Sequence, residues 1–595
     1  ANTEQIKQII GIAEKDPASW RNTTLEERHR IMFEAANRLG DMRGDLIGSM
    51  CAVTGKTVVE GDVEVSEGID YARFYTTTMK KFAALHDVDI TSKGTILVIS
   101  PWNFPCAIPI GGIVAGLAGG NTVILKPATV AAPVAWLFAK AFWDAGVPKE
   151  ALQVIITDRE ALKELTTAPA IKHIILTGGT DTAQSIARIN PSTPLSAETG
   201  GKNAIILTAS GDRDHAIMNI VTSAFGNAGQ KCSACSLLLV ERSVYEDKNF
   251  QDKLKDAATS IKVGSVWEAG NVVGPMITNR NDKLLQALTL EPGESWLVPP
   301  KFIDEKQYIL APTVKWGVKP GSYSFRTELF GPMLSVACID NLQQGIELVN
   351  SLDYGLTSGL QSLDENEQKL WKDSILAGNL YINRGITGAI VNRQPFGGMK
   401  LSAFGGGVKA GGPNYCACLV KITDKPESNT DYKQSYPHAY EEEFAHARDI
   451  NKLYGEQNAF RYLPLKNMVL RLFPGDSNEE AEMIALATKL CHTPLTISFD
   501  PNDDRTTALS STGCTLKKET LDEFLKTMRS YERIRTCGAD IPMEMYEEAA
   551  RRNKYIATAK PVKNGRVELI HYIKEQSISF EFHRYGSILD VPPVE

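Results

Sequence analysis

The chain has 595 residues, 43% of them hydrophobic, and this length exceeds what one compact core can hold, so we expect two or three domains. Its formal net charge of −7 shows no basic footprint for a phosphate backbone, which argues against a nucleic-acid partner and leaves a small or anionic metabolite open as the substrate. The longest apolar stretch, residues 107–120, contains Pro109 and five glycines and is shorter than the roughly 20 residues of a membrane span. We therefore expect no membrane segment.

The ten cysteines are spread over the chain without the dense spacing of a disulfide scaffold, and we recognise no signal peptide. This usage favours a cytoplasmic location. Because residue 1 is an alanine that leads directly into helical sequence, we expect a processed chain or a piece of a longer protein.

Residues 2–85 carry apolar side chains at spacings of three and four, which predicts helices. From 94 to 240, amphipathic helical segments alternate with short apolar runs, namely GTILVIS, NTVILKP, LQVIITD, HIILTGG and NAIILT. Strands that are apolar on both faces and separated by helices predict a doubly wound parallel α/β sheet. This class often binds dinucleotides at the carboxyl ends of its strands.

The interval 236–422 predicts a second α/β unit that ends in the glycine-rich segment PFGGMKLSAFGGGVKAGGPNY. A polar, charged stretch typical of a linker follows, and then MVLRLFP, PLTISFD and the closing strands RVELIHY and SISFEFH predict a smaller α/β domain. We thus predict N-terminal helices and a dinucleotide-binding domain over 1–230, a catalytic domain over 231–422 with some return to the first domain after 395, a linker over 423–447, and a C-terminal domain over 448–595.

Cys232 lies in FGNAGQKCSACS, among small residues that let a ligand approach closely. A thiolate can form a thiohemiacetal with an aldehyde, which can then lose hydride. A lone cysteine is more often a small buried hydrophobe. Cys235 completes a C-x-x-C, but the other close pair, Cys416 and Cys418, has the wrong spacing for zinc, so we expect no metal site.

Two polar residues stand next to predicted strands. Glu198, in SAETGGKN, could activate water as a general base, although an isolated glutamate is usually a solvated surface charge. Asn103, in ISPWNFP, could donate to an oxyanion, or could simply be a turn residue between Pro101 and Pro105. No G-x-G-x-x-G follows the first strand, and the nearest substitute is LTGGTDTA after HIIL.

Taken together, SPWNFP, ILKPA, LTGGTDTA, AETGGKN, GQKCSA, ELFGP and PFGG resemble, in order, the motifs of the aldehyde dehydrogenase superfamily from about residue 20 to residue 415. The resemblance implies the aldehyde dehydrogenase fold, with a Rossmann-like dinucleotide-binding domain, an α/β catalytic domain and here an additional C-terminal α/β domain. It also implies an enzyme. Cys232 would attack the aldehyde, Glu198 would deacylate, and Asn103 would hold the oxyanion together with the backbone amide of Cys232.

The same resemblance implies NAD as the cofactor, with NADP not excluded. Lys126 would bind the adenosine ribose, Glu328 the nicotinamide ribose, and Phe330 would pack on the nicotinamide. Relatives that prefer NAD commonly have glutamate at the position of Thr129, and serine is more common than glycine at Gly179. The implied cofactor contacts are Ile99, Ser100, Pro101, Trp102, Lys126, Thr129, Gly178, Gly179, Glu328 and Phe330.

The tract TGAIVNRQPFGG with KAGGPNY resembles L-glutamate-γ-semialdehyde dehydrogenases, also called pyrroline-5-carboxylate dehydrogenases. This resemblance implies that backbone amides of Gly388 and Ala389, with the Ser233 hydroxyl, hold the substrate α-carboxylate, and that Glu67 meets the α-ammonium. Small residues suit an amide donor because they leave its approach open. In the alternative interpretation, Ser233 fills space and Glu67 is a helix-surface charge.

The segments FRYLPLKNMVLRL and SISFEFHRYGS resemble the carboxyl-terminal region of bacterial proline utilization A proteins. In those proteins a flavin-dependent proline dehydrogenase module precedes the aldehyde dehydrogenase, so FAD would belong only to that module, which this chain lacks. The resemblance implies a proline dehydrogenase module as partner, covalent or not, a homo-oligomer, and a degenerate dehydrogenase-like tail with a structural role.

Two other functions remain open at this point. The enzyme could instead oxidise succinate semialdehyde or another ω-carboxy aldehyde, which lacks an α-ammonium for Glu67. A non-catalytic scaffold that keeps the fold is a further alternative, against which the presence of Cys232, Glu198 and Asn103 argues.

Overall fold

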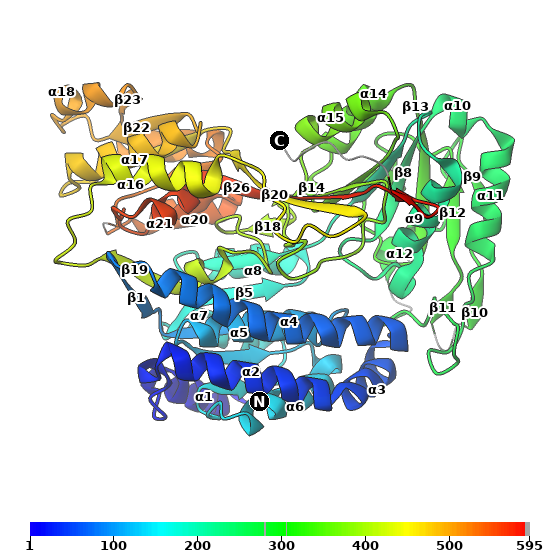
Figure 1. The fold of residues 1–595 in the computed structure, drawn as a ribbon, viewed down its shortest axis with the longest axis horizontal. Coiled ribbons are helices and arrows are strands. Elements are labelled where there is room, and N and C mark those ends of the chain that lie inside the picture. The colour runs from blue at the N-terminus through cyan, green and yellow to red at the C-terminus, as the bar shows by residue number, and fades with distance from the viewer. Residues whose placement is uncertain (279–280, 305, 307, 539, 589–595) are drawn as a thin grey trace.

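The computed structural model describes residues 1–278, 281–304, 306, 308–538 and 540–588. Within these ranges, most strands belong to three parallel or mixed sheets, each covered by helices (Figure 1). Figure 1 shows the N-terminal helices and first sheet in blue and cyan, the second unit in green, and the tail in yellow and red.

The predicted helical region is confirmed. Its helices are α1 (Thr3–Lys15), α2 (Leu25–Asp41), α3 (Arg43–Thr54) and α4 (Val58–Ala83). The longest, α4, packs against α5 (Ala107–Ala118), where an added Cβ at Gly68 would lie 3.0 Å from the Ile110 side chain. This close approach brings one face of α4 next to the loop that follows the first sheet strand.

The first sheet has parallel strands except at one edge. In spatial order it comprises β18 (Ala403–Phe404), β6 (Leu195–Glu198), β5 (Ile171–Thr177), β2 (Thr95–Ile99), β3 (Thr122–Lys126) and β4 (Leu152–Val154), with β18 antiparallel to β6. Alternate residues of β2 join different cores: Ile96 packs with α5 and α6 (Ala132–Asp144), whereas Leu97 packs with α1, α7 (Arg159–Thr167) and α8 (Thr180–Ile189). The sheet is therefore covered on both faces, as the apolar runs predicted.

The second sheet forms the centre of the green unit. Its spatial order is β20 (Glu456–Pro464), β26 (Ile573–Glu581), β16 (Asn379–Ile382), β15 (Thr357–Gln361), β7 (Asn203–Leu207), β8 (Cys235–Glu241), β13 (Met333–Ile339), β12 (Thr313–Trp316) and β9 (Ser295–Val298). One face packs on α9 (Arg213–Phe225) and α11 (Lys248–Thr259), and the other on α14 (Leu342–Asn350) and α15 (Glu365–Ser374).

The strand β7 corrects one predicted boundary. We expected NAIILT in the first domain, within 1–230, but β7 lies between β15 and β8 in the second sheet. The first sheet's consecutive strands thus end at β6, and the chain changes sheets at residues 199–202. An apolar pattern reports burial on both faces but does not say which sheet a strand joins.

The tail has its own parallel sheet, in the order β23 (Thr515–Lys518), β22 (Leu495–Phe499), β21 (Met468–Arg471), β24 (Arg533–Arg535) and β25 (Tyr555–Ala557). Helices α17 (Asn478–Leu490), α19 (Leu521–Thr527) and α20 (Met543–Arg552) cover it. We expected a separate tail domain over 448–595, but β20 and β26 from this range do not join the tail sheet. They pair with each other and with β16 of the catalytic sheet, and Figure 1 shows both crossing between the two units.

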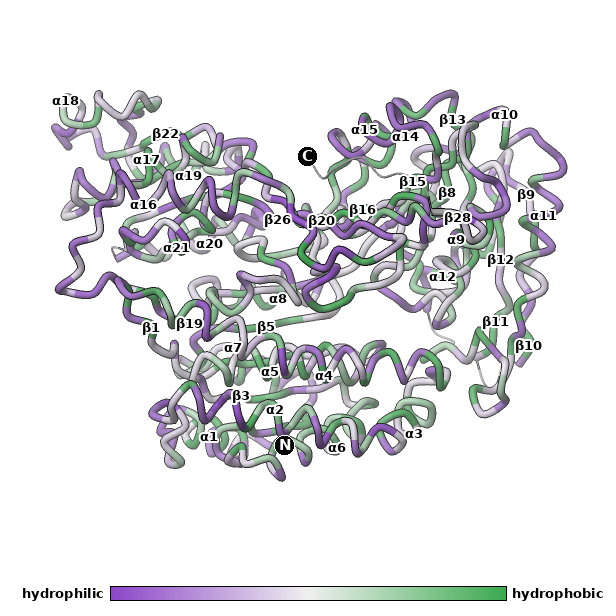
Figure 2. The backbone as a smooth tube through the Cα atoms, in the orientation of Figure 1, coloured by the Kyte–Doolittle hydropathy of each residue, from purple (hydrophilic) through white to green (hydrophobic). Residues whose placement is uncertain are grey.

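Two local predictions were wrong. The expected linker over 423–447 contains α16 (Tyr432–Ala439) and a π-helical turn (Tyr440–Phe444), and Tyr432 and Tyr436 are buried in the tail's core. The segment has few aliphatic residues, which made it resemble a linker, but its tyrosines supply the apolar surface that it buries. The connection before α16 is strongly hydrophilic, as Figure 2 shows. The segment RVELIHY forms α21 (Gly565–Glu568) and a 3₁₀ turn (Leu569–Tyr572) instead of a strand.

Among the described residues, no helix is both long enough and apolar enough to cross a lipid bilayer.

Candidate functional site

Residues with predicted roles meet at the carboxyl edge of the first sheet. In the strand register, Ile99 is opposite both Lys126 and Leu176, and Thr177 is opposite Glu198. Parallel strands end at the same edge, so the turns after β2, β3 and β5 come together there. This edge faces the second sheet, which carries the cysteine.

Cys232 lies in the short turn between a 3₁₀ segment (Gly226–Gly229) and β8. The Asn203 side-chain amide donates to the Cys232 carbonyl oxygen at 2.6 Å and to that of Ala234 at 3.0 Å. At Gly229 the backbone has a φ of +67°, and an added Cβ would collide with the Gly331 carbonyl. Only glycine can adopt this positive φ and leave room for the Gly331 carbonyl, so the first residue of the motif G-Q-K-C must be a glycine for the turn before Cys232 to form.

Asn103 reaches the same turn from the first sheet. Its side-chain amide donates to the backbone carbonyl of Gln230 at 3.0 Å, and Asn103 is only 7% exposed. The second amide hydrogen of this side chain remains able to donate to a nearby oxyanion. The structure therefore places the predicted oxyanion donor against the turn that carries the predicted nucleophile, although Asn103 itself does not line the cavity described below.

A cavity of about 350 Å³ lies between the two sheets and α4. Residues with predicted chemical or substrate-binding roles in its lining are Cys232, Glu198, Glu67, Ser233, Gly388 and Ala389. Segments separated by more than 300 residues in the sequence thus enclose one space, large enough for a small aliphatic substrate.

Glu198 is held beside this cavity by backbone contacts. One carboxylate oxygen accepts from the Gly398 amide at 3.1 Å, and an added Cβ at Gly397 would lie 3.0 Å from the other oxygen. Burial raises the pKa of Glu198 to about 8, and the nearby Lys409 partly offsets that rise. Only the ionised carboxylate can accept a proton from water, and with this pKa that form increases as pH rises through about 8.

Without a ligand in the cavity, Cys232 is held as the protonated thiol. Burial raises its pKa to about 12, and the carboxylates of Glu328 and Glu198 add to the effect. Because two acidic groups surround the sulfur, its ionisation depends on their charge and on what enters the cavity.

The groups implied for the cofactor lie around the sheet edge. Glu328 accepts from the Gly201 amide at 2.9 Å, and the Phe330 ring meets Trp102 edge-on at 5.8 Å between centroids. Lys126 ends β3 and is partly buried, and Ile99 ends β2. Pro101 and Trp102 follow in a half-buried turn, and Thr129 is exposed.

A dinucleotide fits these groups. The Ser100 hydroxyl is buried and has no hydrogen-bond partner within the described part of the chain. Gly179 caps α8, and the space where its Cβ would point is open, so a phosphate could reach this helix N-terminus. Gly178 instead donates its amide to the Glu198 carbonyl at 3.1 Å, which positions the turn.

The predicted substrate anchors also have suitable contacts. Burial raises the pKa of Glu67 to about 8, with Glu64 adding to the rise and Lys56 opposing it. The Tyr381 hydroxyl donates to the Gly388 carbonyl at 2.9 Å. Over the residues that the structure describes, the amides of Gly388 and Ala389 donate to no protein acceptor, so they are available to a ligand.

Sequence reasoning missed two residues that shape the site. Asn203 orients the cysteine turn through the contacts given above, and Lys409, 1% exposed, lies next to Glu198. Lys409 had a sequence signal, because a cation within the glycine-rich GGGVKAGG is unusual. Asn203 had none, since its role arises only when β7 pairs with β8.

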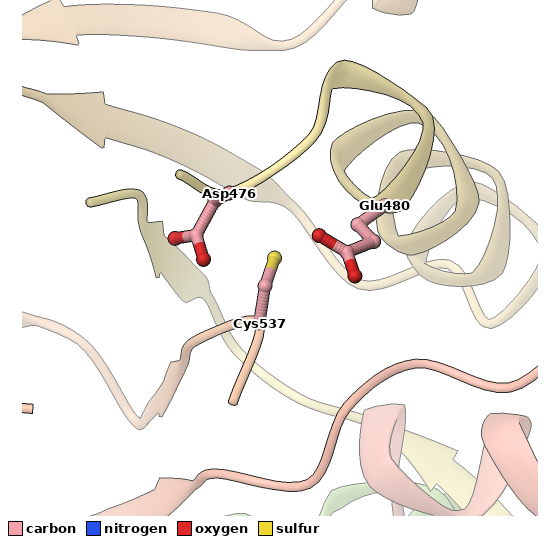
Figure 3. Close-up of side chains that lie close together, drawn as sticks. All are labelled: Asp476, Glu480 and Cys537. Carbon is pink, nitrogen blue, oxygen red and sulfur yellow. The ribbon is translucent and has the colours of Figure 1, made fainter. Parts of the chain in front are cut away.

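A second cluster of acidic and thiol groups lies in the tail (Figure 3). Ligand atoms of Asp476, Glu480 and Cys537 lie within 4.8 Å of one another among the described residues. Asp476 accepts from the Phe473 amide at 2.8 Å, and Glu480 accepts from Ser477 at 3.0 Å in the capping box of α17. These carboxylates thus serve the loop and helix start, and the absence of a metal site stays a prediction.

The chain matches the aldehyde dehydrogenase family over residues 1–423. It is 33% identical over 438 residues to the 1-pyrroline-5-carboxylate dehydrogenase of Geobacillus sp. (strain WCH70), covering 70% of this chain and 84% of that protein. A solved 1-pyrroline-5-carboxylate dehydrogenase from Thermus with bound NAD is 31% identical with a TM-score of 0.67, covering 71% of this chain and 85% of that one.

The tail has a counterpart in a longer protein. Proline utilization A from Corynebacterium freiburgense is 36% identical with a TM-score of 0.87 and covers 99% of this chain, whereas this chain spans 60% of that protein. The family match, the fold and the grouped cysteine, glutamate and asparagine agree, and the chain belongs to the aldehyde dehydrogenase family.

Proposed function

We propose that this chain oxidises L-glutamate γ-semialdehyde, the hydrolysed form of pyrroline-5-carboxylate, to L-glutamate, the second step of proline catabolism. The observation that carries the proposal is the single cavity that joins Cys232 and Glu198 to groups suited to both ends of an amino acid. The relatives named 1-pyrroline-5-carboxylate dehydrogenase support it.

In the proposed reaction, the Cys232 thiol gives its proton to water, and its sulfur bonds to the aldehyde carbon and forms a thiohemiacetal. Donors from the Asn103 amide and the Cys232 backbone stabilise the oxyanion. NAD, when bound, accepts the hydride, and Lys126, Glu328 and Phe330 are the residues that we expect to hold it. The Cys232 thioester then reacts with water, whose proton passes to Glu198 as glutamate leaves.

Recognition of the amino-acid end rests on complementary charge. The free amides of Gly388 and Ala389, with the Ser233 hydroxyl, suit a carboxylate. Glu67 is the carboxylate in this lining best placed for an ammonium group, because its near neighbour Glu64 is already paired with Lys56 at 2.7 Å. A substrate ammonium group would stabilise ionised Glu67 and offset the free-energy cost of burying its charge.

The rival substrate, succinate semialdehyde, has no ammonium and would leave Glu67 unpaired. The test compares kcat/KM for the two aldehydes with NAD and with NADP. We expect glutamate γ-semialdehyde with NAD to give the highest value, and equal values for both aldehydes would contradict the proposed substrate.

The scaffold alternative is tested by Cys232→Ala, with reduced-nicotinamide absorbance and NAD binding as the two measurements. We expect the variant to lose oxidation and to keep NAD binding. Absence of oxidation in the unaltered protein would favour the scaffold, and near-normal turnover in the variant would refute the nucleophile.

We further propose that the chain forms a homo-oligomer and works with a flavin-dependent proline dehydrogenase module, in the same chain or separate. The likeness to Corynebacterium proline utilization A, over 99% of this chain and 60% of that protein, supports the proposed link to a proline dehydrogenase module. Mass measurement in solution and coupled conversion of proline to glutamate test its two parts.

A further inference from the structure

The tail strand β26 brings a buried carboxylate, Glu575, to the active-site segment. Glu575 is 4% exposed, and its two oxygens accept from the Lys409 backbone amide at 2.6 Å and from the Asn414 side-chain amide at 2.7 Å. The tail tethers the same segment a second time, where Arg533 donates to the Gly406 carbonyl at 2.8 Å. Both tethers end on residues in or beside the cavity lining.

Lys409 connects this tail carboxylate to the site. Its ammonium group donates to the Asn379 side-chain oxygen at 2.8 Å and to the Gly397 carbonyl. An added Cβ at Gly397 would lie 3.2 Å from the Lys409 Cγ and 3.0 Å from a Glu198 oxygen. The lysine and the catalytic glutamate therefore flank the same glycine, with no room for a side chain between them.

We propose that Glu575, supplied by the tail, is a positioning residue that fixes Lys409 and thereby sets the protonation state of Glu198. The inference rests on the proposed role of Glu198 as general base. It gives the tail a part in the hydrolytic half of the reaction and not only in covering the site.

The electrostatics fix the expected sign. Burial lowers the pKa of Lys409 to about 8, while Glu198 and Glu575 oppose that fall. Neutralising Glu575 removes one of these two opposing charges, so the Lys409 ammonium loses its proton at lower pH. Glu198 then loses the cation that opposes its own rise, and its pKa moves upward.

Other titratable groups lie around Glu198, Lys409 and Glu575. Burial raises the pKa of Glu575 to about 7, with the hydrogen bond from Asn414 opposing it most. The remaining neighbours that interact with Glu198 or Glu575 are Cys232, Tyr71, Tyr415, Tyr462, Cys418 and Arg566. None of these is changed by the substitution proposed below.

The experiment uses p-nitrophenyl acetate on the whole chain, because this ester needs neither the natural aldehyde nor a nicotinamide. The Cys232 thiol gives its proton to water, and its sulfur takes the acetyl group and expels nitrophenolate. Water then hydrolyses the thioester, and the proton of that water passes to Glu198. The initial burst of nitrophenolate reports acylation, and the steady rate reports deacylation. Both are measured from about pH 6 to 9, a range that brackets the shifted pKa values of Glu198, Lys409 and Glu575.

For Glu575→Gln we expect the acid limb of the steady rate to move up by about half to one pH unit, with the burst rate kept. Glu581→Gln is the matched control, since it makes the same change near the end of the same strand. An unshifted limb, or equal loss of burst and steady rate, overturns the inference.

A second variant covers the case in which Glu575→Gln does not fold. Asn414→Ala removes one donor to Glu575, which raises the pKa of that carboxyl group and gives a smaller shift in the same direction. No shift in a folded Asn414→Ala protein also overturns the inference. Failure of the unaltered chain to release nitrophenolate would instead contradict the proposed nucleophile, so the two failures are distinct.

Discussion

The side-chain amide of Asn103 donates to the backbone carbonyl of Gln230 at 3.0 Å, which ties the turn after the first sheet to the turn that carries the cysteine. The two residues are 127 positions apart in the chain and lie in turns next to strands of different sheets, Asn103 after β2 and Gln230 before β8. This bond holds the proposed oxyanion donor against the turn that carries Cys232, two residues after Gln230. Catalysis of this kind depends on such fixed donors.

Replacing Asn103 by alanine should reduce kcat about 100-fold or more while changing KM little, because the lost donor acts on charge that develops during reaction. Steady-state oxidation of the aldehyde measures this. The alkylation rate of Cys232 serves as the control for an intact turn. A variant with undiminished kcat would remove Asn103 from the oxyanion site.

The pH dependence of turnover should follow Glu198. Its raised pKa, about 8, means that the carboxylate form increases as pH rises through that value, so kcat limited by thioester hydrolysis should rise with it. Glu198→Gln should keep the burst of product formed before hydrolysis and lose most later turnover. A flat profile from about pH 6 to 9 would contradict the assignment.

Glu67 should control selectivity for the amino acid. Glu67→Gln removes the charge that faces an ammonium group, so kcat/KM for glutamate γ-semialdehyde should fall by about tenfold or more, with little change for succinate semialdehyde. Glu4→Gln, at an exposed position in α1, is a control for the charge change itself. Equal losses for both aldehydes would show that Glu67 is structural.

The same substitution should change stability with a defined sign. The pKa of Glu67 is raised to about 8 in the folded chain, so between its unfolded value and about 8 the native state holds a proton that the unfolded chain releases. Stability from this group is therefore lost as pH rises through that window. Denaturant unfolding should show a weaker decline from pH 5 to 8, about the span of that window, in Glu67→Gln than in the unaltered chain.

The buried pair of Lys56 and Glu64 should matter more than any surface ion pair. Glu64 also accepts from the Cys106 and Ala107 amides at 2.7 and 3.1 Å, at the start of α5. Lys56→Met would leave that carboxylate buried without its cation, at a cost of about 3 kcal/mol in unfolding free energy. Lys248→Met, in an exposed pair with Asp252, should cost under about 1 kcal/mol. Similar losses in urea titrations would contradict this difference.

Much of the site could be predicted because local sequence carries its constraints. Gly229 must adopt a positive φ beside Cys232, and the strand before Asn103 must be buried, so both motifs are readable without coordinates. The pairing of β26 with the catalytic sheet could not be predicted in this way. The alternation of apolar and polar residues in β26 predicts a strand. Nothing local specifies that Ser577 pairs with Asn379 of β16, 198 positions earlier in the chain.

The sequence by itself determined the fold class and the helical N-terminal region. It also predicted Cys232, Glu198 and Asn103 as the reactive groups, because burial patterns and reactive groups are properties of short segments. The tertiary structure decided which sheet β7 joins, where the tail strands go, and which charges surround Glu198. Those outcomes depend on long-range contacts, and a buried pKa depends on every charge that packing brings near it.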